Sequence, residues 1–170
     1  MKELWMIGGP MGVGKTAVCR QLQAAEGRSI FVDGDWCWDM RPFVVDDQTK
    51  ELAFANMAAL LNNDLACGEL DEVIFCWVMH QPEIWQRLES SLHTAGCRVH
   101  RVCLVCQPRE LEQRLQKDID AGLRTPDVIP RALDRLESCR SLPVALVDTT
   151  GLSAAQVAQR LRQMARQKLV

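Results

Sequence analysis

The 170-residue chain has no apolar run long enough to cross a bilayer, no tyrosine and almost no excess of charge. Its 20 basic and 22 acidic residues give a formal net charge of −2, so charge offers no argument for a nucleic acid or an anionic membrane as partner. The first apolar stretch meets Gly8 after a few residues and is too short for a signal peptide. We therefore expect a cytoplasmic monomer or homodimer without membrane or nucleic-acid partners.

The eight cysteines lack the paired arrangement of a zinc or redox site. Cys103 and Cys106 have CxxC spacing, but no second CxxC follows them, and a structural zinc needs four ligands. Most of the cysteines fall in apolar segments, where a free thiol behaves as a small buried hydrophobic group. We expect them to be core thiols.

Strand-like and helix-like segments alternate along the chain, without an internal repeat, a low-complexity tract or a linker. This alternation is typical of a parallel sheet covered by helices on both faces, and it predicts a three-layer α/β fold in a single domain over residues 1–170. Strands are expected over 3–7, 29–32, 73–79, 99–105 and 144–147, and the main helices over 16–24, 48–66 and 153–168, with others after Pro82, Pro108 and Pro130.

The segment 122–130, GLRTPDVIP, contains two prolines four residues apart. Both cannot lie inside one regular helix, because proline lacks the N–H that a helix interior requires. The sequence therefore predicts a turn or a hinged cover here, followed by a helix that carries Leu133 and Leu136.

Residues 9–16, GPMGVGKT, match G-x-x-x-x-G-K-[ST] at every fixed position, after an expected strand and at the start of an expected helix. Glycines let successive backbone N–H groups point at phosphate oxygens, and the helix adds the positive end of its dipole. In this motif Lys15 neutralises the β- and γ-phosphates and the Thr16 hydroxyl can ligate Mg²⁺. A chance glycine turn is disfavoured by this setting. The expected nucleotide-binding residues are Gly9, Met11, Gly12, Val13, Gly14, Lys15, Thr16 and Ala17.

A second glycine-containing segment, Asp148-Thr149-Thr150-Gly151, resembles the DxxG motif of GTPases. It follows the last expected strand rather than a middle one, and the chain has no Asn-Lys-x-Asp motif to read guanine. The sequence therefore argues against a GTPase.

The turn Asp33-Gly34-Asp35 follows the second expected strand. Because the carboxyl ends of parallel strands line the ligand crevice of such a sheet, we expect both acids to face residues 9–16. One carboxylate could hold Mg²⁺ while the other accepts the proton of a hydroxyl that attacks the γ-phosphate. The alternative is turn chemistry alone, since Asp and Gly are common in turns.

A glycine-rich phosphate motif, then a short strand ending in Asp-Gly-Asp, resembles the P-loop small-molecule and nucleotide kinases. Shikimate kinase, gluconate kinase and adenylylsulfate kinase carry comparable acids there, and P-loop proteins of tunicamycin and chloramphenicol resistance are also similar. The resemblance implies a five-stranded parallel sheet of order 2-3-1-4-5, ATP and Mg²⁺ as cofactors, and a short helical lid over about 118–138.

The resemblance also implies roles for single residues. Asp33 would lie near Mg²⁺, Asp35 would be the general base or an acceptor ligand, and Arg114 would pack on the adenine ring. The lid region of this family supplies arginines to the transferring phosphoryl group, and here it contains Arg124, Arg131 and Arg135. A solvated helix face is the alternative for Arg131 and Arg135, and Arg124 could be a mobile finger or simply exposed.

One signature of many nucleoside monophosphate kinases is missing. They carry Asp-Gly-x-Pro-Arg after the third strand, whereas residues 77–83 read WVMHQPE. The absent arginine argues against an ordinary monophosphate acceptor.

Several side chains are candidates for the acceptor side. Trp36 and Trp38 follow the acids in a loop, where large rings should not be exposed without purpose, so they could wall a pocket. Trp77 ends the third strand, where core packing is the favoured interpretation and acceptor binding the alternative. His80 could contact acceptor or phosphate, or could be a polar cap. Arg41 could bind an acidic acceptor, or could only be exposed.

The leading hypothesis is an ATP-dependent phosphotransferase that moves the γ-phosphate of ATP to a hydroxyl of a metabolite, nucleoside, nucleotide or antibiotic. Its expected catalytic residues are Lys15, Asp35, Arg131 and Arg135. One alternative is a resistance or regulatory protein that binds a nucleotide and a ligand without phosphoryl transfer. Another is an ATPase that couples hydrolysis to a partner protein, which the short chain makes less favoured.

Overall fold

The computed structural model describes residues 1–24 and 27–167. Five parallel strands form one sheet in the order β2-β3-β1-β4-β5, which confirms the expected α/β fold and strand order. The strands are β1 Lys2–Gly8, β2 Ser29–Asp33, β3 Glu72–Cys76, β4 Cys97–Val105 and β5 Ala145–Asp148. The helices are α1 Lys15–Gln23, α2 Asp47–Ala66, α3 Pro82–Ser90, α4 Pro108–Asp120, α5 Val128–Arg140 and α6 Ala154–Gln167, with a short 3₁₀ helix η1 Gly34–Trp38.

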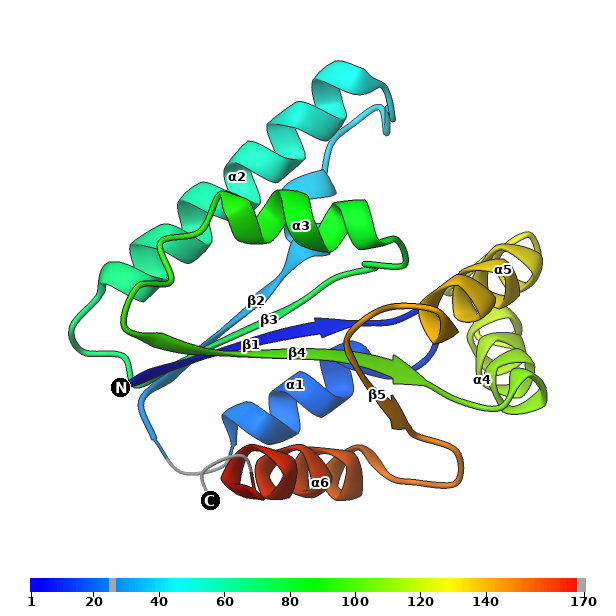
Figure 1. Ribbon diagram of the computed structural model, residues 1–170. Coiled ribbons are helices and arrows are strands. Elements are labelled where there is room, and N and C mark those ends of the chain that lie inside the picture. Colours follow the sequence, from blue (N-terminus) through cyan, green and yellow to red (C-terminus); the bar gives the residue numbers. More distant parts are fainter. Residues whose placement is uncertain (25–26, 168–170) are drawn as a thin grey trace.

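Helices cover both faces of the sheet (Figure 1). Helices α2 and α3 lie on one face, while α1 and α6 pack against each other on the opposite face. Helices α4 and α5 pack together beyond the carboxyl ends of β1 and β4. In the part of the chain described here, no helix combines the length and the hydropathy that crossing a bilayer requires.

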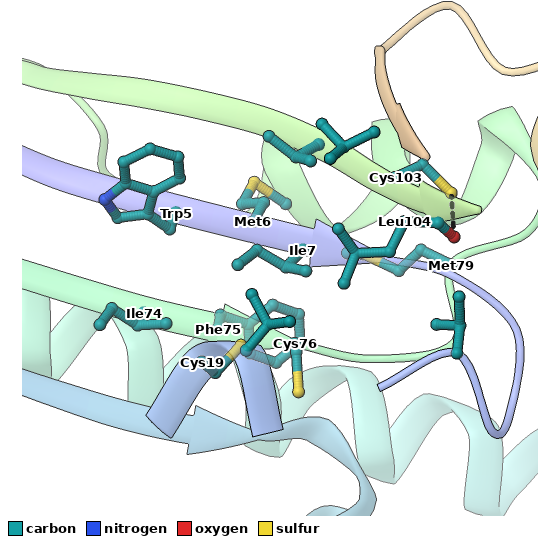
Figure 2. Packing of buried hydrophobic residues seen from close by; sticks show 14 of the residues in the cluster. Trp5, Met6, Ile7, Cys19, Ile74, Phe75, Cys76, Met79, Cys103 and Leu104 are labelled. Carbon is teal, nitrogen blue, oxygen red and sulfur yellow. Dashed lines mark hydrogen bonds between the residues drawn. The ribbon is translucent and has the colours of Figure 1, made fainter. Parts of the chain in front are cut away.

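Strand β1 forms the centre of the core, between β3 and β4. A strand with neighbours on both sides and helices on both faces needs apolar side chains where it is fully covered, and Leu4, Trp5, Met6 and Ile7 are all buried. Figure 2 shows Trp5, Met6 and Ile7 between Ile74 and Phe75 of β3 and Leu104 of β4. This central packing fixes where β1 ends, and therefore where the turn at residues 9–14 begins.

A buried carboxylate connects α6 to the sheet. Glu72, the first residue of β3, accepts a hydrogen bond from Trp5 Nε1 at 2.7 Å and one from Arg162 Nη2 at 2.7 Å. The same Arg162 nitrogen donates to the carbonyl oxygen of Leu22 in α1 at 2.9 Å. Burying a charge is costly unless it is paired and hydrogen-bonded, and this network meets that condition.

Two boundaries differ from the sequence prediction by more than two residues. Strand β3 ends at Cys76 rather than at residue 79, and the Trp77 N–H still bonds to the carbonyl oxygen of Ile7 at 3.2 Å. Helix α5 begins at Val128, so the prediction of a turn was wrong for the last residues of segment 122–130. Pro130 is accommodated because it lies in the first turn, where its missing N–H has no helical partner. The expected end of the last helix at residue 168 lies outside the described residues.

The prediction of core thiols is only partly confirmed. All eight cysteines are free, and five of them are buried: Cys19, Cys76, Cys103, Cys106 and Cys139. Cys37 and Cys97 are half-buried, and the prediction was wrong for Cys67, which is exposed directly after α2. In Figure 2, the side chains of Cys19 of α1 and Cys76 at the end of β3 lie close together. These thiols are packing groups next to the turn at residues 9–14.

Candidate active site

The turn between β1 and α1 takes its shape from glycines in the left-handed region. The φ angles are 143° at Gly9, 77° at Gly12 and 103° at Gly14, values that side chains rarely adopt. A Cβ on Gly12 would also lie 2.6 Å from Cδ2 of Leu115, so the turn packs tightly against α4. The turn therefore leads into α1 with the free N–H groups of the helix start beside it, which is a ready-made anion site.

Lys15 and Thr16 open helix α1 and face this turn. The Lys15 ammonium group donates to the carbonyl oxygens of Gly9 and Pro10, each at 3.0 Å, and the Thr16 hydroxyl donates to Asp33 Oδ2 at 2.9 Å. Burial lowers the pKa of Lys15, and the negative charges nearby, including those of Asp35 and Asp33, oppose that shift. An anion bound in the turn would replace the two carbonyl oxygens as the partner of the lysine.

Asp33 is fixed by two hydrogen bonds at the end of β2. Its Oδ2 accepts from Thr16, and its Oδ1 accepts the Asp35 N–H at 3.1 Å as the N-cap of η1. A carboxylate and a hydroxyl oxygen in contact suit Mg²⁺, which prefers oxygen ligands. Across residues 1–24 and 27–167, no group of three or more His, Cys, Asp or Glu side chains could hold a metal ion. A magnesium ion here would therefore complete its shell with phosphate oxygens and water.

A cavity of about 310 Å³ lies over the turn. Besides six of the expected nucleotide-binding residues, its lining includes Asp118 in the last turn of α4 and Arg124, whose Nε lies 3.0 Å from Asp118 Oδ2. Sequence reasoning missed Asp118, because its only signal is a position off the buried face of α4. The complete lining is Met11, Gly12, Gly14, Lys15, Thr16, Ala17, Asp33, Asp35, Val78, Asp118 and Arg124.

A second, larger cavity of about 790 Å³ adjoins the first. Three residues, Met11, Asp35 and Val78, line both cavities. Asp35 is thus placed at the boundary between them. One cavity lies over the turn at residues 9–14, called the phosphate turn below, and the other is lined by the aromatic side chains that follow β2 and β3. The larger lining is Met11, Asp35, Trp36, Trp38, Asp39, Phe43, Val45, Trp77, Val78, His80, Ile84 and Arg135.

The Asp35 carboxyl holds its proton more tightly than an ordinary aspartate. Partial loss of hydration raises its pKa above the usual 3.8, and the charge of Asp33 raises it further, while Lys15 acts in the opposite direction. Its backbone position is fixed by the bond to Asp33. A carboxylate with raised proton affinity at the boundary of two cavities can accept a proton from a bound hydroxyl.

Indole rings make up much of the larger cavity wall. The rings of Trp38 and Trp77 are nearly parallel, with centroids 6.3 Å apart, and Trp36 meets Phe31 edge-on. The favoured interpretation of Trp77 as a core residue is incomplete, because its half-buried ring packs on the core and also lines the cavity. Gly34 makes room for it, since a Cβ there would lie 2.7 Å from Trp77 Cγ.

The expected arginines are distributed unevenly. Arg135 donates to Sδ of Met11 and lines the larger cavity. Arg114 lies behind the turn and donates to the carbonyl oxygens of Val13 at 2.9 Å and Thr149 at 3.1 Å. The structure therefore brings α4, the phosphate turn and the loop after β5 together.

Other candidates occupy different surroundings. Arg131 is exposed and pairs with Asp127 at 2.7 Å, and neither it nor the exposed Arg41 lines either cavity. His80 does line the larger cavity, and burial, followed by the charge of Arg135, lowers its pKa. The roles expected for all of these side chains stay predictions.

The order of the sheet and the glycine turn between β1 and α1 define a protein of the P-loop class. A model of the AAA domain family matches residues 6–124, which is most of the chain, and the chain belongs to that family. No curated protein matches this sequence.

Solved structures with the same fold include P-loop kinases, so the predicted resemblance is confirmed at the level of the fold. The tunicamycin resistance protein of Deinococcus radiodurans is 23% identical, with a TM-score of 0.74 over 97% of this chain and 96% of that one. A gluconokinase from Sinorhizobium meliloti is 19% identical, with a TM-score of 0.69 over 98% and 95%. Shikimate kinase from Acinetobacter baumannii, in complex with shikimate, is 20% identical, with a TM-score of 0.68 over 99% and 94%.

Proposed function

We propose that the protein is an ATP-dependent phosphotransferase that moves the γ-phosphate of ATP to a hydroxyl of a small molecule. The observation that carries the proposal is the position of Asp35 at the junction of the two cavities. ATP would occupy the smaller cavity and the acceptor the larger one, so the only carboxylate common to both linings would meet the reacting hydroxyl. The protein would act on its acceptor as a cytoplasmic monomer or homodimer.

In the proposed reaction Asp35 accepts the proton of the acceptor hydroxyl. The hydroxyl oxygen forms a bond to the γ-phosphorus while the bond from that phosphorus to the bridging β–γ oxygen breaks, and ADP leaves. Lys15 stabilises the charge on the phosphates, because it can exchange its contacts to Gly9 and Pro10 for phosphate oxygens. Thr16 and Asp33 would hold Mg²⁺, which supplies further neutralisation of phosphate charge when bound.

We further propose that residues 118–138 form a lid. The segment contributes Asp118 and Arg124 to the smaller cavity and Arg135 to the larger one. Arginines from a cover that touches both substrates suit the stabilisation of charge on a transferring phosphoryl group. Arg131 would reach that group only if its pairing with Asp127 were broken.

The decisive substitution is Asp35→Asn, tested in a screen of hydroxyl acceptors for acceptor-dependent ADP release. We expect turnover to fall about 10²–10⁴-fold, the usual contribution of a general base, while ATP binding measured by calorimetry is retained. Because the pKa of Asp35 is raised, wild-type activity should decline on acidification at a pH above 3.8.

Asp39→Asn is the matched control. Asp39 lines only the larger cavity, so its amide variant should keep the turnover number and change at most the KM for the acceptor. If Asp35→Asn turns over as fast as the wild type, or if no acceptor raises ADP release above the background rate, the proposal is wrong.

A second candidate is a resistance protein that binds ATP and a ligand without phosphoryl transfer. The observation that favours it is the similarity in fold to a tunicamycin resistance protein. In that case Asp35→Asn should leave protection of cells by the expressed protein unchanged.

A further inference from the structure

The larger cavity has a wall that is mainly apolar. Eight of its twelve lining residues are aromatic, aliphatic or methionine side chains, and three of those are tryptophans. A ligand that is polar over its whole surface would lose hydration against such a wall without gaining hydrogen bonds in return. The lining therefore favours a ligand with a substantial apolar part.

Large apolar side chains are also left open at the rim of this cavity. The exposed fractions are 53% for Trp36, 68% for Phe43 and 55% for Val45, and all three line the cavity. Clustered apolar exposure at a hollow surface marks a binding site more often than it marks an ordinary surface. A flat group resting on Trp38 and Phe43, whose ring centroids lie 6.4 Å apart, would cover this rim.

The charged groups of the cavity disfavour an acidic ligand. Asp35 and Asp39 contribute two carboxylates, whereas Arg135 is the single arginine or lysine of the lining and already donates to Met11. Burial, followed by the charge of Arg135, lowers the pKa of His80 and so disfavours a positive charge on its ring. A carboxylate near Asp35 would also lie at the border of the smaller cavity, where the proposed function places the phosphates of ATP.

We propose that the acceptor is an uncharged or cationic compound with a flat apolar group, rather than a small polyol or sugar acid. The flat apolar group would be attached to the part of the acceptor that carries the reacting hydroxyl. The inference rests on the proposed function for the position of the reacting hydroxyl at Asp35. The cavity volume of about 790 Å³ is in the range of sites that bury drug-sized molecules. The flat group would lie against Trp38 and Phe43, which line the larger cavity but not the smaller one.

The test compares matched pairs of neutral glycosides that differ in one group, such as methyl and 2-naphthyl β-glucosides, with gluconate and shikimate as small acids. Binding is measured by calorimetry in the presence of Mg²⁺ and a non-hydrolysable ATP analogue. We expect the naphthyl member of a pair to bind at least about tenfold more tightly than the methyl member, and more tightly than either acid. Equal affinities within the pairs, or tighter binding of an acid, would overturn the inference.

Two variants of neighbouring residues test where the naphthyl group binds. Phe43→Ser should remove most of the naphthyl advantage, whereas Val44→Ser should preserve it, because Val44 is 40% exposed in the same segment but does not line the cavity. Equal losses in both variants would count against the assigned position. The comparison of ligands on the wild-type protein stands without either variant.

Measuring ADP release with ATP and the same compounds separates this inference from the proposed function. Tight naphthyl binding without ADP release would overturn the phosphotransferase and support the apolar acceptor cavity. ADP release with gluconate or shikimate, together with weak naphthyl binding, would support the phosphotransferase activity and overturn the inference of an apolar acceptor.

Discussion

At the scale of single residues, Gly34 shows how two parts of the site depend on one missing side chain. It stands between Asp33, the last residue of β2, and Asp35, and the Trp77 ring occupies the space where its Cβ would be. The glycine thus lets the acids of one strand end and the indole of the next lie against each other.

Gly34→Ala should therefore destabilise the fold. The new Cβ would lie 2.7–2.8 Å from three atoms of Trp77, so the indole must move, at a cost of about 1–3 kcal/mol in the free energy of unfolding measured in urea. Gly68→Ala is the control, because a Cβ there meets no atom within 4 Å and the residue does not have a positive φ. Equal stability of the two variants would contradict this packing argument.

At the scale of secondary structure, Arg162 connects helix α6 to the sheet by hydrogen bonds. Arg162 pairs with the buried Glu72 of β3 and donates to the Leu22 carbonyl of α1. Through this side chain, α6 is bonded to β3 and to α1, on the face of the sheet opposite to α2 and α3.

Arg162→Ala should cost about 3–5 kcal/mol in the free energy of unfolding, because it leaves the Glu72 carboxylate buried without its cation. Arg160→Ala is the control on the same helix, since Arg160 is exposed, and it should change the stability by less than about 0.5 kcal/mol. Thermal or urea unfolding of both variants gives the comparison. A small effect at Arg162 would mean that water replaces the arginine as hydrogen-bond partner of the Glu72 carboxylate, and would contradict the prediction.

The same scale shows what the sequence could and could not predict. The alternation of strands and helices and the motif at residues 9–16 are local patterns, so the parallel sheet and the phosphate turn were predictable from them. The strand order was implied by the resemblance to P-loop kinases and not by these patterns. The end of β3 was not, because the apolar run continues past Cys76 as the wall of a cavity rather than as a strand. Pro130 was misleading because a proline in the first turn of a helix has the same local sequence as one in a hinge.

Site residues contributed by distant segments were the hardest to foresee. Asp118 lines the cavity over the phosphate turn because α4 packs beside that turn. Thr149, in the loop after β5, accepts a hydrogen bond from Arg114 of α4. Neither has a distinctive spacing in the sequence. Asp33 and Asp35 were found because a strand end next to a strong motif is itself a local signal.

At the scale of the whole molecule, nucleotide binding should stabilise the fold. With Mg-ATP at about one hundred times its dissociation constant, the stabilisation is about 2.7 kcal/mol, which corresponds to a rise in Tm of about 5–10 °C for a chain of this size. Lys15→Ala should abolish most of this shift, whereas Lys50→Ala, on the exposed side of α2, should keep it. Chelation of Mg²⁺ should reduce the wild-type shift. An identical shift in both variants would contradict the assignment of Lys15.

The shared wall of the two cavities has a consequence for inhibition. Because Met11, Asp35 and Val78 line both cavities, the space over the phosphate turn and the space lined by the indoles adjoin at these three residues. A single molecule in which a short polyphosphate tether joins adenosine to an aromatic alcohol could span both. Since the second half would then bind at the high effective concentration set by its tether, such a bisubstrate analogue should bind far more tightly than either half alone.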